Sequence, residues 1–215
     1  MIKVLIADDH QLLIDGLRPL LERHSDVEVV GVAHDGLTAT DLANQTKPDI
    51  ILMDISMPKL NGIDATRKVL GTLPDTRIII LSMHADRRFI QEALRAGARG
   101  YILKESAASE LIQAVSSVHK GELYFSASVR DKVLKEYVER IKDGTQTPPS
   151  PLSSREREVL QILAEGNTTK DAAAILNVSV KTIESHRKQI MDKLDLHSIA
   201  ALTKYAIRAG ITQLD

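Results

Sequence analysis

Short apolar runs and amphipathic stretches alternate along the chain up to about residue 120. Each apolar run is rich in Val, Ile and Leu with little alternation, which is typical of a strand buried on both faces of a parallel sheet. The stretches between the runs have helical periodicity, and glycines at 36, 62 and 97 punctuate the connections. Strands are predicted at 2–7, 28–33, 49–54, 77–82 and 100–103, and helices at about 11–23, 36–46, 62–72, 86–96 and 107–120.

This alternation predicts an α/β fold for the N-terminal part of the chain. Strand and helix in strict succession indicate parallel βαβ units with helices on both faces of the sheet. The expected architecture is a doubly wound, five-stranded parallel sheet of the flavodoxin-like kind, followed by a small all-α domain. Ligands of such sheets bind beyond the carboxyl ends of the strands, which directs attention to those ends.

A boundary between two domains is predicted near residue 150. Residues 127–142 have a charged helical pattern, and residues 143–151 are rich in Gly, Thr and Pro, which is typical of an exposed linker. The predicted domains are therefore 1–122, a helical segment and flexible linker at 123–151, and a C-terminal domain at 152–215.

The C-terminal domain is predicted to contain four helices with a helix-turn-helix outline. Ser153 and Glu156 have the spacing of a capping box, and Thr168, Ser179 and Ser198 are candidate N-caps of the next three helices. The helix after Ser179 extends to about Leu194. A short helix, a tight turn and a longer helix form the outline of many DNA-binding domains.

Composition limits the classes of protein that remain. The chain has 215 residues with 43% hydrophobic and 3% aromatic residues, a formal net charge of −1 and no cysteine. Aliphatic cores are expected, disulfides and thiolate metal sites are excluded, and no global attraction to nucleic acid is expected. The chain begins directly with a strand pattern and has no apolar stretch of about 20 residues, so a cytoplasmic protein without a signal peptide or membrane contact is expected.

Five side chains at the ends of predicted strands define a candidate phosphoryl-transfer site. They are Asp8, Asp9, Asp54, Ser82 and Lys104. Three clustered acids repel one another unless a hard cation binds, and oxygen ligands suit Mg²⁺. We predict that Asp54 is the nucleophile, that Asp9 and Asp54 hold Mg²⁺ with Asp8 acting through water, and that Ser82 and Lys104 contact phosphoryl oxygens.

Each of these residues alone has an ordinary structural explanation. An Asp pair after a strand is usually a turn or a helix cap, and a lone Lys or Ser at a strand end carries little information. The five together, in this order, favour the functional interpretation. With Met57-Pro58, Gly62 and Ala96-Gly97-Ala98, residues 2–120 resemble the receiver domain of two-component response regulators.

The resemblance to receiver domains implies specific partners and roles. It implies that Asp54 takes phosphate from a phosphohistidine of a sensor histidine kinase, and that the Ser56 main-chain carbonyl completes the Mg²⁺ ligands. It implies that Tyr101 is the switch aromatic, although an aromatic that simply covers the sheet edge is an equal alternative. The chain departs from many receivers at Glu105, where they have a cis proline, so a trans or strained bond is expected there.

Residues 152–211 resemble the LuxR-type helix-turn-helix. The match includes Leu152 to Leu160, Glu165-Gly166 and Val178 to His186, with a departure at Thr169 to Ala172, where the family usually has Asn-Lys-Glu-Ile. The whole chain therefore resembles a NarL/FixJ-type response regulator. The family's docking implies that Glu184, Ser185 and Lys188 face base edges and that Lys181, Thr182, His186 and Arg187 meet phosphates. A structural histidine is an equal alternative for His186.

The leading hypothesis is a transcription regulator rather than an enzyme. It binds double-stranded promoter DNA as a homodimer when phosphorylated, with RNA polymerase as a candidate partner. An aspartyl phosphatase is one alternative, but the second carboxylate of an Asp-x-Asp motif is missing from Asp54-Ile55-Ser56. A regulator that works without phosphate is another alternative, although such a protein is expected to lose part of the acidic site.

Overall fold

The chain forms two compact units, one built around a parallel sheet and one built of helices. This computed structural model describes residues 1–83, 85–133 and 151–212. Residues 127–133 are helical, as predicted. The rest of the predicted helix, at 134–142, and residues 143–150 of the predicted linker lie outside the described residues.

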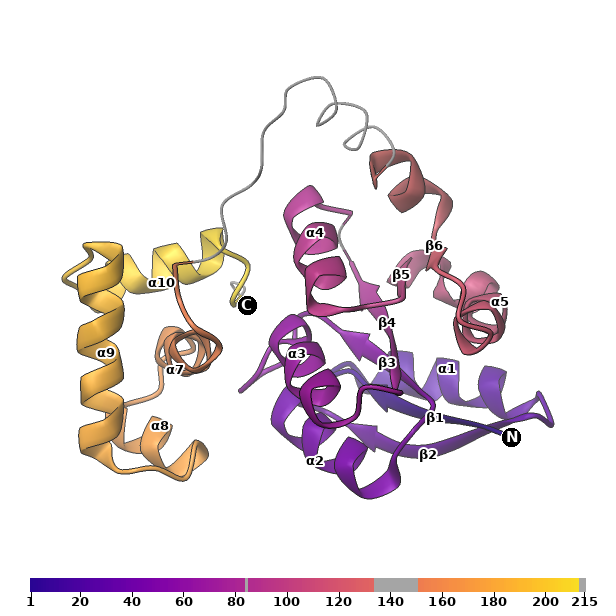
Figure 1. Cartoon of the computed structure of the whole chain (residues 1–215), viewed down its shortest axis with the longest axis horizontal. Coiled ribbons are helices and arrows are strands. Elements are labelled where there is room, and N and C mark those ends of the chain that lie inside the picture. The colour runs from indigo at the N-terminus through magenta and orange to yellow at the C-terminus, as the bar shows by residue number, and fades with distance from the viewer. Residues whose placement is uncertain (84, 134–150, 213–215) are drawn as a thin grey trace. The chain divides into compact units, whose positions relative to one another are not determined.

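The sheet of the first unit has the strand order β2-β1-β3-β4-β5-β6, with every neighbouring pair parallel. The order reverses beside β1, so β1 and β3 lie side by side at the centre of the sheet (Figure 1). The carboxyl ends of these two strands therefore face the same crevice. The strands are β1 (Ile2–Ala7), β2 (Val27–Ala33), β3 (Ile50–Asp54), β4 (Arg77–Ser82), β5 (Gly100–Leu103) and β6 (Tyr124–Phe125).

Helices cover both faces of this sheet. Helices α1 and α5 contact each other, and α3 contacts both α2 and α4. The helices are α1 (Gln11–Glu22), α2 (Gly36–Thr46), α3 (Gly62–Thr72), α4 (Arg87–Ala96) and α5 (Ala107–His119), with a short 3₁₀ turn at Lys104–Ser106. The α/β prediction is confirmed, and the core is aliphatic except for Tyr101, the largest fully buried side chain.

The prediction of five strands missed one. Strand β6 pairs with β5, and the amide of Ser126 donates to the carbonyl of Tyr101. A strand of two residues leaves no periodicity in the sequence, so the pattern could not reveal it. Beyond β6, the Ser126 hydroxyl accepts from the Leu103 amide (3.2 Å) and the Lys132 ammonium donates to the Ala85 carbonyl (2.8 Å). The segment after β6 thus contacts the loops that follow β4 and β5.

The second unit consists of short helices that each begin at a side-chain cap. Ser153, Thr168, Ser179 and Ser198 accept hydrogen bonds from amides in the first turns, and the predicted capping box at Ser153 and Glu156 is present. These caps confirm the predicted helix starts. The helices are α7 (Ser154–Ala164), α8 (Thr169–Ile175), α9 (Val180–Leu194) and α10 (Ile199–Arg208).

One aliphatic core holds these helices together. Helix α9 contacts α7 and α8, and α10 contacts α7. Ile183 and Ile190 on α9 are fully buried in this core together with Ala172 of α8. Short α8 and longer α9 therefore form the predicted helix-turn-helix, with the turn at Asn177, where the backbone is left-handed (φ 51°).

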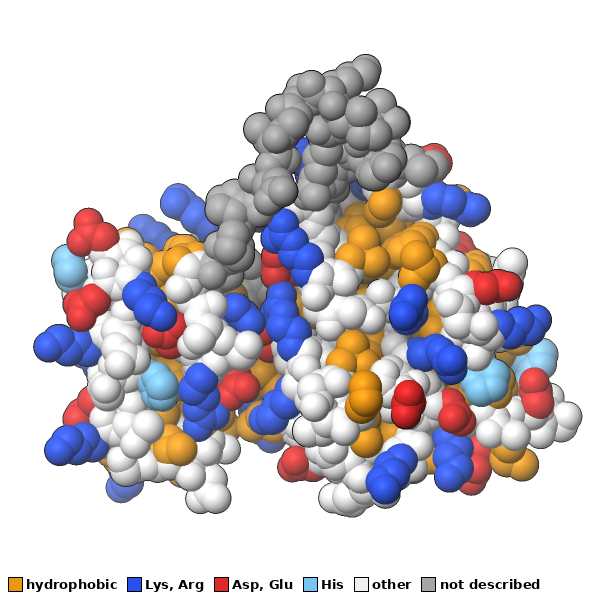
Figure 2. All heavy atoms as spheres, viewed as in Figure 1, with side chains coloured by type: hydrophobic (Ala, Val, Ile, Leu, Met, Phe, Trp, Pro, Cys, Tyr) orange, Lys and Arg blue, Asp and Glu red, His pale blue; other side chains and the backbone are white. Residues whose placement is uncertain are grey.

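Within the described ranges, no helix has both the length and the apolarity needed to cross a bilayer. On the face drawn in Figure 2, basic side chains are scattered among acidic and neutral ones, as a net charge of −1 leads one to expect.

Candidate functional site

Two buried carboxylates lie side by side at the centre of the sheet edge. Asp54 is the last residue of β3, and Asp8 follows β1 directly. Because Ala7 pairs with Met53 across the two strands, the next residues on each strand meet at the same level. Asp8 is 0% exposed and Asp54 is 1% exposed. Two carboxylates buried this completely are stable in the ionised form only if cationic groups lie beside them.

Lys104 supplies a cation to both carboxylates. Its ammonium nitrogen lies 2.8 Å from Asp8 Oδ2 and 3.0 Å from Asp54 Oδ2, and its side chain is 6% exposed. Lys104 follows β5 and opens the 3₁₀ turn, and the peptide bond to Glu105 is trans. The trans bond agrees with the expectation drawn from the missing proline. Lys104 therefore contacts both acids although no proline follows it.

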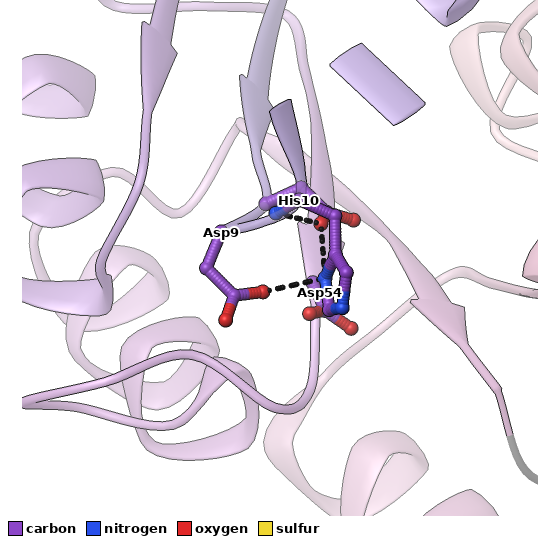
Figure 3. Close-up of side chains that lie close together, drawn as sticks. Asp9, His10 and Asp54 are labelled. Atoms are coloured by element: carbon purple, nitrogen blue, oxygen red, sulfur yellow. Dashed lines mark hydrogen bonds and ion pairs between the residues drawn. The ribbon is translucent and has the colours of Figure 1, made fainter. Parts of the chain in front are cut away.

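Asp9 and His10 complete the cluster on its exposed side. His10 Nδ1 lies 2.8 Å from Asp9 Oδ1 and 3.1 Å from Asp8 Oδ1. The side-chain ligand atoms of Asp8, Asp9, His10 and Asp54 all lie within 4.8 Å of one another. Figure 3 shows the His10 ring turned toward the Asp9 carboxylate. Sequence reasoning missed His10, although its place directly after the acid pair was a usable signal.

The environment of Asp54 disfavours its ionised form. Burial, and then the charge of Asp8, raise the pKa of Asp54 from 3.8 to about 6, while Lys104 and the Ser56 backbone amide act in the opposite direction. A carboxylate with a raised pKa is less well solvated and more basic than an ordinary aspartate. The Ser56 backbone, predicted to offer its carbonyl, thus already contacts this carboxylate through its amide.

Ser82 and Tyr101 are coupled to each other beside the acids. Ser82 ends β4 and is 3% exposed, and Tyr101 on the neighbouring β5 is 1% exposed. Burial raises the pKa of Tyr101 to about 12, and a hydrogen bond with the Ser82 side chain opposes that rise. The Tyr101 side chain is therefore buried in the fold and hydrogen-bonded to the predicted phosphate-binding serine.

Gly62, at the start of α3, allows the chain to pass close to the acid cluster. A Cβ at this position would lie 1.9 Å from the Asp54 carbonyl oxygen. The Gly62 amide also donates to the Ile55 carbonyl at 2.9 Å. A larger residue would displace the end of β3, so the glycine is required by the geometry of the site.

Helix α9 carries the predicted DNA-contact residues on its outer face. Lys181, Glu184, Ser185 and Lys188 are all exposed, and Ile183 and Ile190 face the core. Arg187 is half-buried. Helix α9 therefore has an apolar face toward the core and a polar face toward solvent.

Two polar side chains of the α9 region, Thr182 and Lys193, make contacts within this unit. The Thr182 hydroxyl lies 2.8 Å from the Ser179 hydroxyl, and Lys193 donates to the buried Glu156 at 2.7 Å. His186 is half-buried, and its Nδ1 is buried without a hydrogen bond among the described residues. Lys193 thus fastens α9 to α7, a role that sequence reasoning missed because it depends on a contact 37 residues away.

Two known domain families account for most of the chain. Residues 4–116 match the response regulator receiver domain, and residues 150–206 match the bacterial regulatory proteins of the luxR family. A doubly wound sheet with an acid–lysine cluster at its carboxyl edge, joined to a helix-turn-helix, thus defines a response regulator.

Relatives that span both domains place the chain more narrowly. It is 39% identical to the transcriptional regulatory protein MctR of Rhizobium johnstonii over 210 residues (98% of this chain, 95% of MctR). It is also 39% identical to the oxygen regulatory protein NreC of Staphylococcus aureus over 215 residues (98% and 99%). A solved structure of RcsB dimers bound to DNA is similar, with a TM-score of 0.59, 30% identity and coverage of 95% and 97%. The chain belongs to the NarL/FixJ-type two-component response regulators, which are DNA-binding transcription regulators.

Proposed function

We propose that Asp54 accepts a phosphoryl group from a sensor histidine kinase and that this reaction controls promoter binding. In the reaction, an Asp54 carboxylate oxygen attacks phosphorus while the bond from phosphorus to the kinase imidazole breaks. The observation that carries the proposal is the position of Asp54 at the end of a central strand. There it lies 3.0 Å from the Lys104 ammonium and beside Asp8.

The residues around Asp54 fit a divalent cation. Asp8 Oδ2 and Asp54 Oδ2 are both buried, and the single Lys104 ammonium lies between them, at 2.8 Å and 3.0 Å. One cation cannot fully balance three acids, so an oxygen-rich site with net negative charge remains. We propose that Asp9, Asp54 and the Ser56 carbonyl hold Mg²⁺, with Asp8 acting through water. When bound, Mg²⁺ neutralises phosphoryl oxygens and helps to orient in-line attack.

Ser82, Lys104 and Tyr101 then transmit the reaction. We propose that the Lys104 ammonium forms an ion pair with one phosphoryl oxygen and that the Ser82 hydroxyl donates a hydrogen bond to another. Because the Tyr101 side chain is hydrogen-bonded to the Ser82 side chain, movement of the serine changes the packing of the aromatic ring. The face of the first unit near β5 is thereby coupled to the phosphorylation state.

The pKa of Asp54 is expected to be visible in Mg²⁺-free buffer. Its carboxyl carbon should titrate near pH 6 by ¹³C NMR, and Mg²⁺ should lower that pKa because a cation favours the charged form.

The same pKa also affects stability, because the change in the Asp54 pKa from 3.8 to about 6 corresponds to about 3 kcal/mol. A raised pKa means that this contribution to stability is present at low pH and is lost as pH rises through about 6. Titration near pH 4 without metal would contradict this description of the site.

Phosphorylation is proposed to act on DNA binding through association of two chains. One helix-turn-helix contacts a single half-site, whereas a dimer gains affinity because its second contact is intramolecular. The similarity to the solved complex of RcsB dimers with DNA supports this arrangement. RNA polymerase is a further candidate partner, and a cytoplasmic location is part of the same proposal.

Sedimentation and DNA binding measured together test the proposed function. With acetyl phosphate or beryllofluoride plus Mg²⁺, the chain is expected to dimerise and to bind promoter DNA more tightly than the untreated chain. A chain that stays monomeric with unchanged DNA affinity in both states would contradict the proposal. Turnover of generic phosphate esters would favour the aspartyl phosphatase alternative instead.

Helix α9 is proposed to enter the major groove, with base-reading and phosphate-binding residues on different parts of its surface. Glu184, Ser185 and Lys188 are assigned to base edges, and the phosphate contacts are Lys181, Thr182, His186 and Arg187. Lys188→Ala is expected to cost about 1–3 kcal/mol of binding and to relax preference at one or two positions in each half-site. Arg187→Ala should weaken all sequences alike and lower the salt slope by roughly one unit.

A binding selection on both variants at two salt concentrations measures these effects, with Gln189→Ala as the control. Gln189 is exposed on the same helix and has no assigned contact. If Lys188→Ala keeps the original sequence preference and Arg187→Ala changes it, the two roles are reversed.

A further inference from the structure

His10 places an imidazole nitrogen among the oxygen atoms of the acid cluster. Its Nδ1 lies 2.8 Å from Asp9 Oδ1, 3.1 Å from Asp8 Oδ1 and 3.4 Å from the Lys104 ammonium. The ring is 61% exposed, so burial does not force it into this position. The backbone of His10 is held locally, because its amide donates to Asp8 Oδ1 at 2.9 Å.

These separations match those between neighbouring ligands of one metal ion. Ligand atoms about 2.1 Å from an octahedral ion lie about 3.0 Å apart when they occupy adjacent positions. The 2.8 Å separation of Nδ1 from Asp9 Oδ1 is close to that value, and the ligand atoms of Asp9, His10 and Asp54 all lie within 4.8 Å of one another. The buried oxygen Asp54 Oδ2 belongs to the same cluster and lies 3.0 Å from the Lys104 ammonium.

We propose that His10 Nδ1 is a metal ligand, so that this site binds divalent transition ions such as Mn²⁺ and Co²⁺ with a nitrogen atom as well as oxygen atoms. Mg²⁺ favours oxygen ligands, whereas imidazole favours transition ions. His10 therefore shifts the selectivity of the site toward transition ions without being needed for Mg²⁺. The inference rests on the proposed phosphoacceptor function only in that both use the same acid cluster.

Calorimetric titration of the full chain with Mg²⁺ and Co²⁺ tests the selectivity. His10→Gln replaces the nitrogen by an amide oxygen of similar reach. It is expected to weaken Co²⁺ binding tenfold or more and to change Mg²⁺ binding by less than about threefold. The control is His34→Gln, an exposed histidine just after β2 at the same edge of the sheet. Equal losses for the two metals in His10→Gln, or no loss for Co²⁺, would overturn the proposal.

Pulsed electron paramagnetic resonance of bound Mn²⁺ gives a second measurement that does not depend on affinity. The original chain and His34→Gln are expected to show coupling to a directly bonded ¹⁴N nucleus, and His10→Gln is expected to lose it. Absence of that coupling in the original chain would overturn the assignment of His10. Persistent labelling of Asp54 in the same preparation would show that the phosphoacceptor function stands even so, whereas loss of labelling would contradict that function separately.

Discussion

Replacement of Asp54 by asparagine is expected to abolish labelling by a small phosphodonor such as acetyl phosphate. The amide has no nucleophilic oxygen of comparable basicity, and the neighbouring acids cannot substitute for it. Asp8 is fully buried against Lys104, and Asp9 lies on the exposed rim of the cluster. Mass spectrometry of the intact chain, with and without the phosphodonor, measures the loss directly.

A matched substitution separates this chemical effect from general damage to β3. Asp49 lies just before the amino end of that strand, where its carboxylate accepts from the Lys3 amide at 2.8 Å. Asp49→Asn should keep full labelling. In Mg²⁺-free buffer at pH 7, Asp54→Asn should be at least as resistant to unfolding as the original chain. The neutral amide avoids the desolvation cost of a buried carboxylate charge. Phosphate found on Asp54→Asn would remove the basis of the proposed function.

Removal of the cation, or of Asp9, is expected to slow phosphorylation by orders of magnitude. The phosphoryl group brings negative charge to a site that already holds three acids and one lysine, so without a cation the donor is repelled. The comparison is the labelling rate in Mg²⁺ and in EDTA, for the original chain and for Asp9→Ala. Asp9 is 33% exposed, so its loss should not unfold the sheet.

Asp15→Ala provides the matched control for Asp9→Ala. Asp15 is an exposed acid on α1 that accepts from the Gln11 side chain at 2.7 Å and does not belong to the cluster. Its removal takes away one negative charge from the same region and should leave the rate unchanged. Equal labelling rates in Mg²⁺ and in EDTA would mean that the acids serve some purpose other than holding a cation.

The sequence predicted the positions of the site residues but not their mutual contacts. Strand ends can be located from apolar runs, and parallel strands bring their carboxyl ends to one edge, so Asp8, Asp54 and Lys104 could be placed together. Which carboxylate oxygen the lysine meets depends on side-chain torsions that periodicity does not encode. For the same reason, neither the Tyr101–Ser82 contact nor the direction of the His10 ring could be derived.

The helix starts of the second unit could be predicted because their causes are local. A capping side chain acts on amides two or three residues away, so Ser153 and Ser179 were recognisable in the sequence. The ion pair between Lys193 and Glu156 was not, since it joins helices that only the tertiary fold brings together. Strand β6 could not be predicted from the sequence for the same reason, because its two residues pair with β5 only in the folded sheet.

The four self-capped helices have a consequence for how the chain reaches its folded state. Helices α7 to α10 are joined by connections of a few residues, so most contacts of this unit close short loops. The sheet unit must instead bring β1 beside β3 across an intervening strand and two helices before either strand has a partner on that side. Because loop closure of this kind is slow, we expect the helical unit to fold faster than the sheet unit after dilution from denaturant, although it is synthesised last.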